Sequence, residues 1–146
     1  MDNWLLVLAF LAGALLPVQA AVNARLGRSL GSAPRAAAVS FLVGLAALTF
    51  YLVLLRPGPA PAIAERTPGW AWLGGLIGAL YVLTATLVAP RIGVAALTGL
   101  AVAGQMAASI ALDHFGVFGL PVHPVNWARL TGVALMAAGF LLVRRF

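Results

Sequence analysis

The side chains of this sequence that could do chemistry are mainly amides and single acids. The chain has no cysteine, so it offers no thiolate nucleophile, no disulfide and no cysteine metal site. Its two histidines, His114 and His123, lie too far apart, with too few ligands nearby, to predict a zinc site. We find no nucleophile–base–acid set and no phosphate-binding loop. The sequence therefore predicts no enzyme, no cofactor and no metal centre.

The most informative amide is Gln105, which lies near the middle of a long apolar stretch. On a helical wheel it shares one stripe with Thr98, Ser109 and Asp113. An amide that faced lipid would lose its hydrogen bonds, so this stripe should face the interior of a helix bundle or a wet cavity. Two interpretations remain open for Gln105, either hydrogen bonding between helices or binding of a substrate.

A second polar pair, Gln19 and Asn23, lies on one helical face just after Pro17. Proline frees the carbonyl four residues earlier, at Gly13, so we expect a kinked helix there. A kinked helix with amides beside a free carbonyl is one way in which carriers build a polar site. The alternative is an ordinary helix end near the membrane interface. We take Gln19, Asn23, Gln105 and Tyr81 as the candidate substrate-binding residues.

Asp113 is the only acid that adjoins an apolar stretch, and His114 follows it. If the protein couples its activity to protons, these two residues are the candidate coupling groups. A carboxylate at a helix C-terminus is unfavourable with the helix dipole, so we expect Asp113 to have a partner. Arg129 is the natural candidate for that partner.

These residues are carried by five apolar stretches that are almost free of charge. Each is long enough, at about 1.5 Å per residue, to cross the hydrocarbon core of a bilayer. Charged residues make up only 8% of the 146 residues, against about 25% in soluble domains. We therefore predict an all-α integral membrane protein, one transmembrane domain over residues 1–146. The expected spans are 4–22, 36–55, 70–89, 94–112 and 127–143.

The ends of these stretches carry the expected boundary signals. Gly31 should end the first helix, and Ser32 should cap the second, with Pro34 in its first turn. Residues 17–20 look like a cleavage site, but no positive charge precedes them, so we expect a retained helix rather than a signal peptide.

The charges and the indole rings indicate an orientation in the membrane. With five spans the arginines divide six to three in favour of the C-terminal side, which predicts a cytoplasmic C-terminus. The net charge of +6 is spread as single arginines between spans, so it does not predict nucleic-acid binding. All four tryptophans fall at the start of a span on the N-terminal side, as an interfacial belt would require. They are Trp4, Trp70, Trp72 and Trp127.

Gly74 and Gly78 form a small-xxx-small surface in the third stretch. Such a surface lets another helix backbone approach closely, and we predict that it serves helix packing.

Several motifs together resemble the YdcZ-like family of five-span inner-membrane proteins in the drug/metabolite transporter superfamily. The resemblance covers nearly the whole chain. The motifs are Pro17-Val18-Gln19-Ala20 with Asn23, Trp70-x-Trp72-x-Gly74-Gly75-x-x-Gly78, Gly104-Gln105 and Asp113-His114-Phe115-Gly116. The resemblance implies a bacterial inner-membrane transporter or exporter of small molecules with no assigned substrate. It also implies one half of a ten-helix carrier, whose larger relatives hold two inverted halves.

The resemblance leads to two hypotheses about function. The first is a small-molecule transporter that works as a homodimer by alternating access, for which we favour antiparallel pairing. The six-to-three arginine bias argues against that pairing, because dual insertion requires a bias near zero. The second is a membrane scaffold or accessory subunit that transports nothing. Small multidrug exporters carry a membrane-embedded glutamate in their first helix, whereas this chain offers Gln19 and Asn23, so proton antiport of the same design is not expected.

Overall fold

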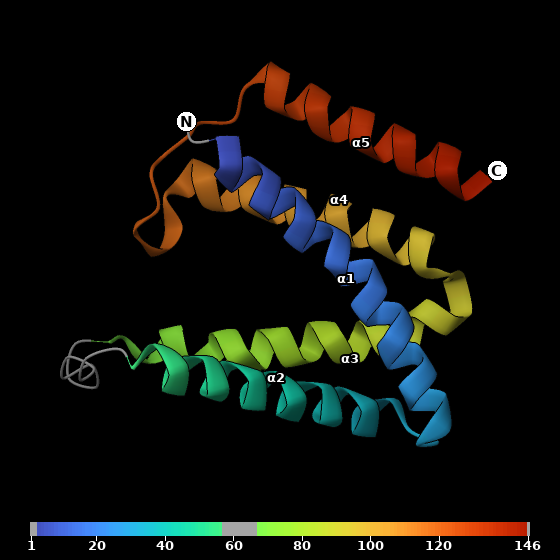
Figure 1. Ribbon diagram of the computed structural model, residues 1–146. Coiled ribbons are helices and arrows are strands. Elements are labelled where there is room, and N and C mark those ends of the chain that lie inside the picture. Colours follow the sequence, from blue (N-terminus) through green and yellow to red (C-terminus); the bar gives the residue numbers. More distant parts are fainter. Residues whose placement is uncertain (1–2, 57–66, 146) are drawn as a thin grey trace. The chain divides into compact units, whose positions relative to one another are not determined.

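The computed structural model describes residues 3–56 and 67–145, and in these ranges helices joined by short connections make up the chain (Figure 1). It has five α-helices and two short 3₁₀ helices, and the described ranges hold no strand. The elements are α1 (Asn3–Ser29), α2 (Ala33–Leu55), η1 (Gly69–Leu73), α3 (Gly74–Ile92), α4 (Val94–Phe115), η2 (Val117–Gly119) and α5 (Trp127–Arg145).

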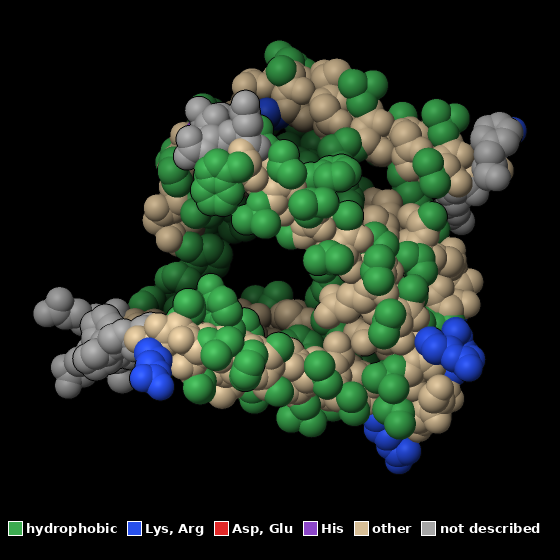
Figure 2. Space-filling model, viewed as in Figure 1, with side chains coloured by type: hydrophobic (Ala, Val, Ile, Leu, Met, Phe, Trp, Pro, Cys, Tyr) green, Lys and Arg blue, Asp and Glu red, His purple; other side chains and the backbone are tan. Residues whose placement is uncertain are grey.

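Four of these helical segments are long and apolar enough to cross a membrane: Trp4–Ser29, Ala33–Leu55, Gly69–Ile92 and Val94–Phe115. The apolar stretch of α5, Trp127–Val143, is shorter. Leucine, valine and phenylalanine side chains are exposed along most of the helices, and Figure 2 shows basic side chains only near helix ends on the visible face. A protein in water would bury such side chains, whereas lipid solvates them. The predicted fold class, an all-α membrane protein, is confirmed.

The helices group into two compact units, Met1–Arg91 and Ile92–Phe146. The first contains α1, α2, η1 and nearly all of α3, and the second contains α4, η2 and α5. The proposal of a single transmembrane domain stays a prediction.

In the first unit, α1 and α2 form a helical hairpin whose turn follows the predicted signals. Gly31 adopts a φ of 63°, a left-handed conformation that glycine takes without steric cost. The hydroxyl of Ser32 then caps α2 by accepting a hydrogen bond from the Arg35 backbone N–H at 3.4 Å. The predicted turn and cap are confirmed.

The core of the first unit is made of small side chains. Gly27 lies so close to α3 that an added Cβ would be 3.4 Å from the Thr86 methyl group. The Thr86 hydroxyl donates to the Val82 carbonyl at 2.8 Å, which satisfies it within its own helix. Small side chains allow helix backbones to approach closely in lipid, where no hydrophobic force drives them together. The buried side chains are Ala20, Asn23, Ala24, Ala36, Ala37, Val82, Ala85, Thr86 and Ala89.

Several helices run beyond the predicted spans. α1 continues without interruption through Pro17 and past residue 22 to Ser29, so no break occurs at the proline. α3 begins at Gly74, after the 3₁₀ turn, and continues through Pro90 to Ile92. Only Gly93 separates α3 from α4, and its φ of 84° is open to glycine alone at little cost. The helices thus extend beyond the apolar stretches, and the predicted membrane spans within them stay a prediction.

In the second unit, α4 packs along α5 through a ring-against-glycine contact. A Cβ added at Gly99 would overlap the Phe140 ring, with ring carbon Cε2 only 2.8 Å away. The missing side chain of Gly99 therefore makes room for an aromatic ring. α4 ends at Gly116, which adopts a φ of 57°, and the Asn126 side chain caps α5 by accepting from the Arg129 N–H at 2.9 Å.

Candidate functional site

Two of the predicted substrate-binding residues, Gln19 and Asn23, lie on the surface of α1 that faces α2. Asn23 is only 4% exposed, and its Nδ2 donates a hydrogen bond to the Ser40 hydroxyl at 3.3 Å. Gln19 lies one helical turn before Asn23 on the same face of α1 and is exposed. The two amides and the hydroxyl therefore form one polar group on an otherwise apolar helix pair.

A cavity of about 300 Å³ includes Gln19 and Ser40 of this polar group in its lining, and we call it the α1–α2 pocket. Gln19 and Ser40 supply its polar groups, and the remaining lining residues are Phe41, Gly44, Leu45 and Leu48. The Gln19 amide can donate two hydrogen bonds and accept two, while Ser40 can donate or accept. The lining carries no formal charge. The pocket can therefore hold a hydrogen-bonding group against an aromatic and aliphatic wall.

The other two predicted substrate-binding residues are not joined to this pocket by any described contact. Tyr81 lies on α3 of the same unit and is 37% exposed. Gln105 lies on α4 of the second unit and is exposed. For both residues, a role in substrate binding stays a prediction.

Asp113 pairs with Arg129, as the sequence predicts. One Arg129 guanidinium nitrogen, Nη1, lies 3.2 Å from the Asp113 Oδ2 atom, and the two side chains are 31% and 35% exposed respectively. The same nitrogen donates to the His123 carbonyl at 3.3 Å, and the His123 N–H donates to the Asp113 carbonyl at 2.9 Å. The end of α4, the connection and the start of α5 are thereby held together.

His114 is part of the same connection. Its Nδ1 atom accepts a hydrogen bond from the Val125 N–H at 3.2 Å, which requires the proton of a neutral ring to be on Nε2. The His114 ring also makes an edge-on contact with Phe115 at a centroid distance of 4.8 Å. His114 thus attaches the connection before α5 to the end of α4. Coupling roles for Asp113 and His114 stay predictions.

A cavity of about 470 Å³ runs between α4 and α5 from this ion pair, and we call it the α4–α5 groove. α4 contributes Met106, Ser109, Ile110 and Asp113, and α5 contributes Arg129, Gly132, Val133 and Met136. The groove is thus charged at one end and apolar along the rest of its length.

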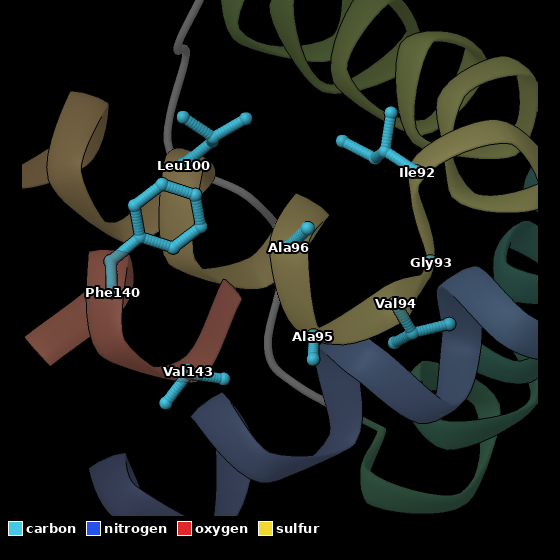
Figure 3. A pocket seen from close by; sticks show the side chains of 8 residues that line it. All are labelled: Ile92, Gly93, Val94, Ala95, Ala96, Leu100, Phe140 and Val143. Atoms are coloured by element: carbon cyan, nitrogen blue, oxygen red, sulfur yellow. The ribbon is translucent and has the colours of Figure 1, made fainter. Parts of the chain in front are cut away.

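A larger cavity of about 570 Å³ lies at the opposite end of the same helix pair (Figure 3). Phe140 and Val143 of α5 face the first turns of α4, where Phe140 lies beside Leu100. Its other lining residues, Ile92 to Ala96, are glycine or aliphatic. Because it holds none of the predicted site residues and no polar side chain, we assign it no chemistry.

The glycines predicted to serve helix packing differ in their surroundings. A Cβ at Gly78 would meet the Phe41 ring at 3.8 Å, an ordinary contact between α3 and α2. A Cβ at Gly74 would meet nothing within 4 Å in the described part of the chain. A packing role for Gly74 therefore stays a prediction about contact with another molecule.

Ser40 lines the α1–α2 pocket and is not among the predicted site residues. One signal could have identified it. Asn23 precedes Gly31 by about as many residues as Ser40 follows it, and in an antiparallel hairpin such residues lie at the same level. Two polar side chains at one level of an apolar hairpin are expected to bond each other.

Comparison with protein-family models shows which family the chain matches. The model of a protein family described as "Putative inner membrane exporter, YdcZ" matches residues 4–142. No curated protein and no solved structure matches the chain.

Proposed function

The chain belongs to the YdcZ inner-membrane exporter family, and from this premise we propose that it moves small molecules across the bacterial inner membrane through a site that includes the α1–α2 pocket. The observation that carries this assignment is the buried Asn23–Ser40 hydrogen bond beside Gln19. Polar side chains are costly on an apolar helix pair and are typical of substrate pathways. Gln19 lies inside the first predicted span, 4–22, and about 15 Å of helix separates it from the end of α1 at Ser29.

Each polar residue in or beside this pocket has a distinct part in the proposal. Gln19 is exposed to the cavity and binds the substrate directly through its amide. Asn23 is nearly inaccessible, so it acts by holding the Ser40 hydroxyl in place. Ser40 then offers its remaining hydrogen-bonding capacity to the substrate.

The lining of the pocket favours one class of substrate. The lining of the α1–α2 pocket has no cationic side chain that could compensate a bound anion. Burying an unpaired charge costs far more than burying a hydrogen-bonded neutral group. Neutral or amphiphilic compounds therefore suit the pocket better than multiply charged anions, and a cationic aromatic compound would have the Phe41 ring face as its partner.

Transport through this site requires an exit to both sides of the membrane, and five helices enclose little space. We propose a homodimer, with antiparallel pairing favoured, in which the paired chains rock about the polar site. Tyr81 and Gln105 complete the substrate pathway in this proposal, and Asp113 with His114 supplies coupling. Support for pairing comes from Gly74, which offers a backbone surface that the described chain leaves open.

The test is solute flux in proteoliposomes made with the purified full chain and a panel of neutral, cationic and anionic compounds. Gln19→Leu removes the hydrogen bonds and keeps a side chain of similar size. Loss of a neutral hydrogen bond to a bound substrate should lower the rate roughly twofold to tenfold. Gln105→Leu, measured in parallel, tests the second predicted amide.

Thr131→Val is the matched control. The Thr131 hydroxyl donates to the Trp127 carbonyl within α5 at 2.8 Å, so its removal leaves both cavities unchanged. If Gln19→Leu transports every active solute as well as the control does, the pocket is not the substrate site. If no solute of the panel moves, the result contradicts the transporter hypothesis and favours a membrane scaffold or accessory subunit.

A further inference from the structure

The walls of the α4–α5 groove are two facing stripes. Met106, Ser109, Ile110 and Asp113 follow one another at helical spacing on α4, and Arg129, Gly132, Val133 and Met136 do the same on α5. Gly132 has nothing within 4 Å of an added Cβ, and Ser109 is also small. The two helices therefore face each other along this line without filling the space between them.

The groove has a polar end and an apolar end, and the fold determines where each one lies. Asp113 is two residues from the end of α4, and Arg129 is two residues from the start of α5. Met106 and Met136 lie about 10 Å further along their helices. In helices that cross a bilayer, the ends lie at the level of the lipid headgroups and the interior lies in hydrocarbon. The groove thus has the same polarity gradient as a lipid molecule.

The charges of the groove select among ligands. Asp113 and Arg129 neutralise each other through Oδ2 and Nη1. A ligand with one charge would pair with one of them and separate it from the other, so the number of ion pairs would not increase. A ligand that carries both charges replaces the Asp113–Arg129 ion pair with two ion pairs, one to each side chain. A carboxylate accepts several hydrogen bonds from a primary ammonium group, and an arginine fork matches a phosphate.

We propose that the α4–α5 groove is a binding site for a zwitterionic phospholipid with a primary ammonium headgroup, of the phosphatidylethanolamine type. The phosphate binds Arg129 and the ammonium group binds Asp113. The first part of one acyl chain lies along the apolar wall formed by Met106, Ile110, Val133 and Met136. This site does not overlap the α1–α2 pocket, because none of its residues lines that pocket, and it shares one residue with the proposed export function, the candidate coupling group Asp113.

The first experiment measures lipid binding to the purified full chain by native mass spectrometry from detergent. Phosphatidylethanolamine, phosphatidylcholine and phosphatidylglycerol with identical acyl chains are compared. We expect the ethanolamine lipid to bind about tenfold more tightly than the other two, because choline cannot donate hydrogen bonds to Asp113 and the glycerol lipid has no cation. Equal binding of the glycerol lipid would overturn the proposal.

Neutralising the charged end should remove this preference. The double variant Asp113→Asn with Arg129→Gln removes both charges and keeps both side chains polar, and it should bind the three lipids within about twofold of one another. Arg91→Gln, in the last turn of α3, is the control for loss of a positive charge and should keep the preference. Retention of the full preference by the double variant would contradict the proposed contacts.

Filling the apolar end tests the acyl-chain contact without changing the ion pair. Gly132→Leu places a side chain in the groove, and Gly139→Leu is the control on the same helix, because both glycines have open space around an added Cβ. We expect Gly132→Leu alone to weaken binding of the ethanolamine lipid about tenfold. Unchanged binding would exclude the groove. Displacement of that lipid by millimolar free leucine would identify a water-soluble zwitterion as the ligand and overturn the lipid assignment.

Discussion

Substitution of Gly99 by alanine tests the contact between α4 and α5. Its effect on stability can be distinguished from the effect of alanine on helix propensity. In Gly99→Ala the new Cβ would lie within 3.0 Å of three Phe140 ring atoms, whereas ordinary contacts are 3.4 to 4 Å. The ring or the helix must therefore move. Overpacking of this kind costs about 1–3 kcal/mol.

The matched control is Gly104→Ala, on the same helix, where an added Cβ meets nothing within 4 Å. Alanine is a better helix former than glycine by up to about 1 kcal/mol, and both variants share this gain. The difference between the two variants therefore isolates the steric cost. We expect Gly99→Ala to be less stable than Gly104→Ala by about 1–3 kcal/mol.

The assay is unfolding of the purified chain in mixed micelles by titration with sodium dodecyl sulfate, followed by far-ultraviolet circular dichroism. A second substitution, Phe140→Leu, removes the ring and should restore much of the stability that Gly99→Ala loses. The double-mutant cycle should then give a coupling of at least about 1 kcal/mol. Equal midpoints for Gly99→Ala and Gly104→Ala, or the absence of coupling with Phe140→Leu, would refute the assignment of this contact.

Two further outcomes can be measured on the same preparations and in cells. Asn23→Leu should lower the free energy of unfolding by about 0.6–1 kcal/mol. Adding Ser40→Ala should lower it little further, because the two side chains share one hydrogen bond. Additive losses would show that the two side chains act separately. Asp2→Cys should be half labelled by an impermeant thiol reagent on intact cells if the chains insert in both orientations, and the absence of native cysteine makes the label specific. Complete labelling, or none, would exclude antiparallel pairing of this chain with itself.

The sequence was sufficient for those features that depend on neighbours along the chain. Apolar stretches of membrane length predicted the helices, and the signals at Gly31 and Ser32 predicted the hairpin turn that the structure shows. The Asp113–Arg129 ion pair was also predictable, because a carboxylate at a helix C-terminus needs a cationic partner and Arg129 lies at the start of the next helix.

Hydropathy marks the apolar part of a helix, whereas boundary residues such as Gly31 predict where the helix ends. The apolar part of the first stretch ends at residue 22, but the hydrogen bonds of α1 continue to Ser29. Backbone hydrogen bonding, rather than lipid, determines where a helix ends. As a result Asn23 is a buried residue inside a helix rather than part of a helix end.

Only the tertiary structure decided which side chains meet between helices. Local patterns identify a stripe on a helix, but they do not say which neighbour that stripe faces. The rotation of α2 about its axis brings Ser40 to Asn23, and the rotation of α5 brings Phe140 onto Gly99. In lipid almost every face of these helices is apolar, so hydrophobicity does not distinguish the packed face from the exposed one. Close approach and hydrogen bonding between distant residues make that choice, and neither can be read from one segment of the chain.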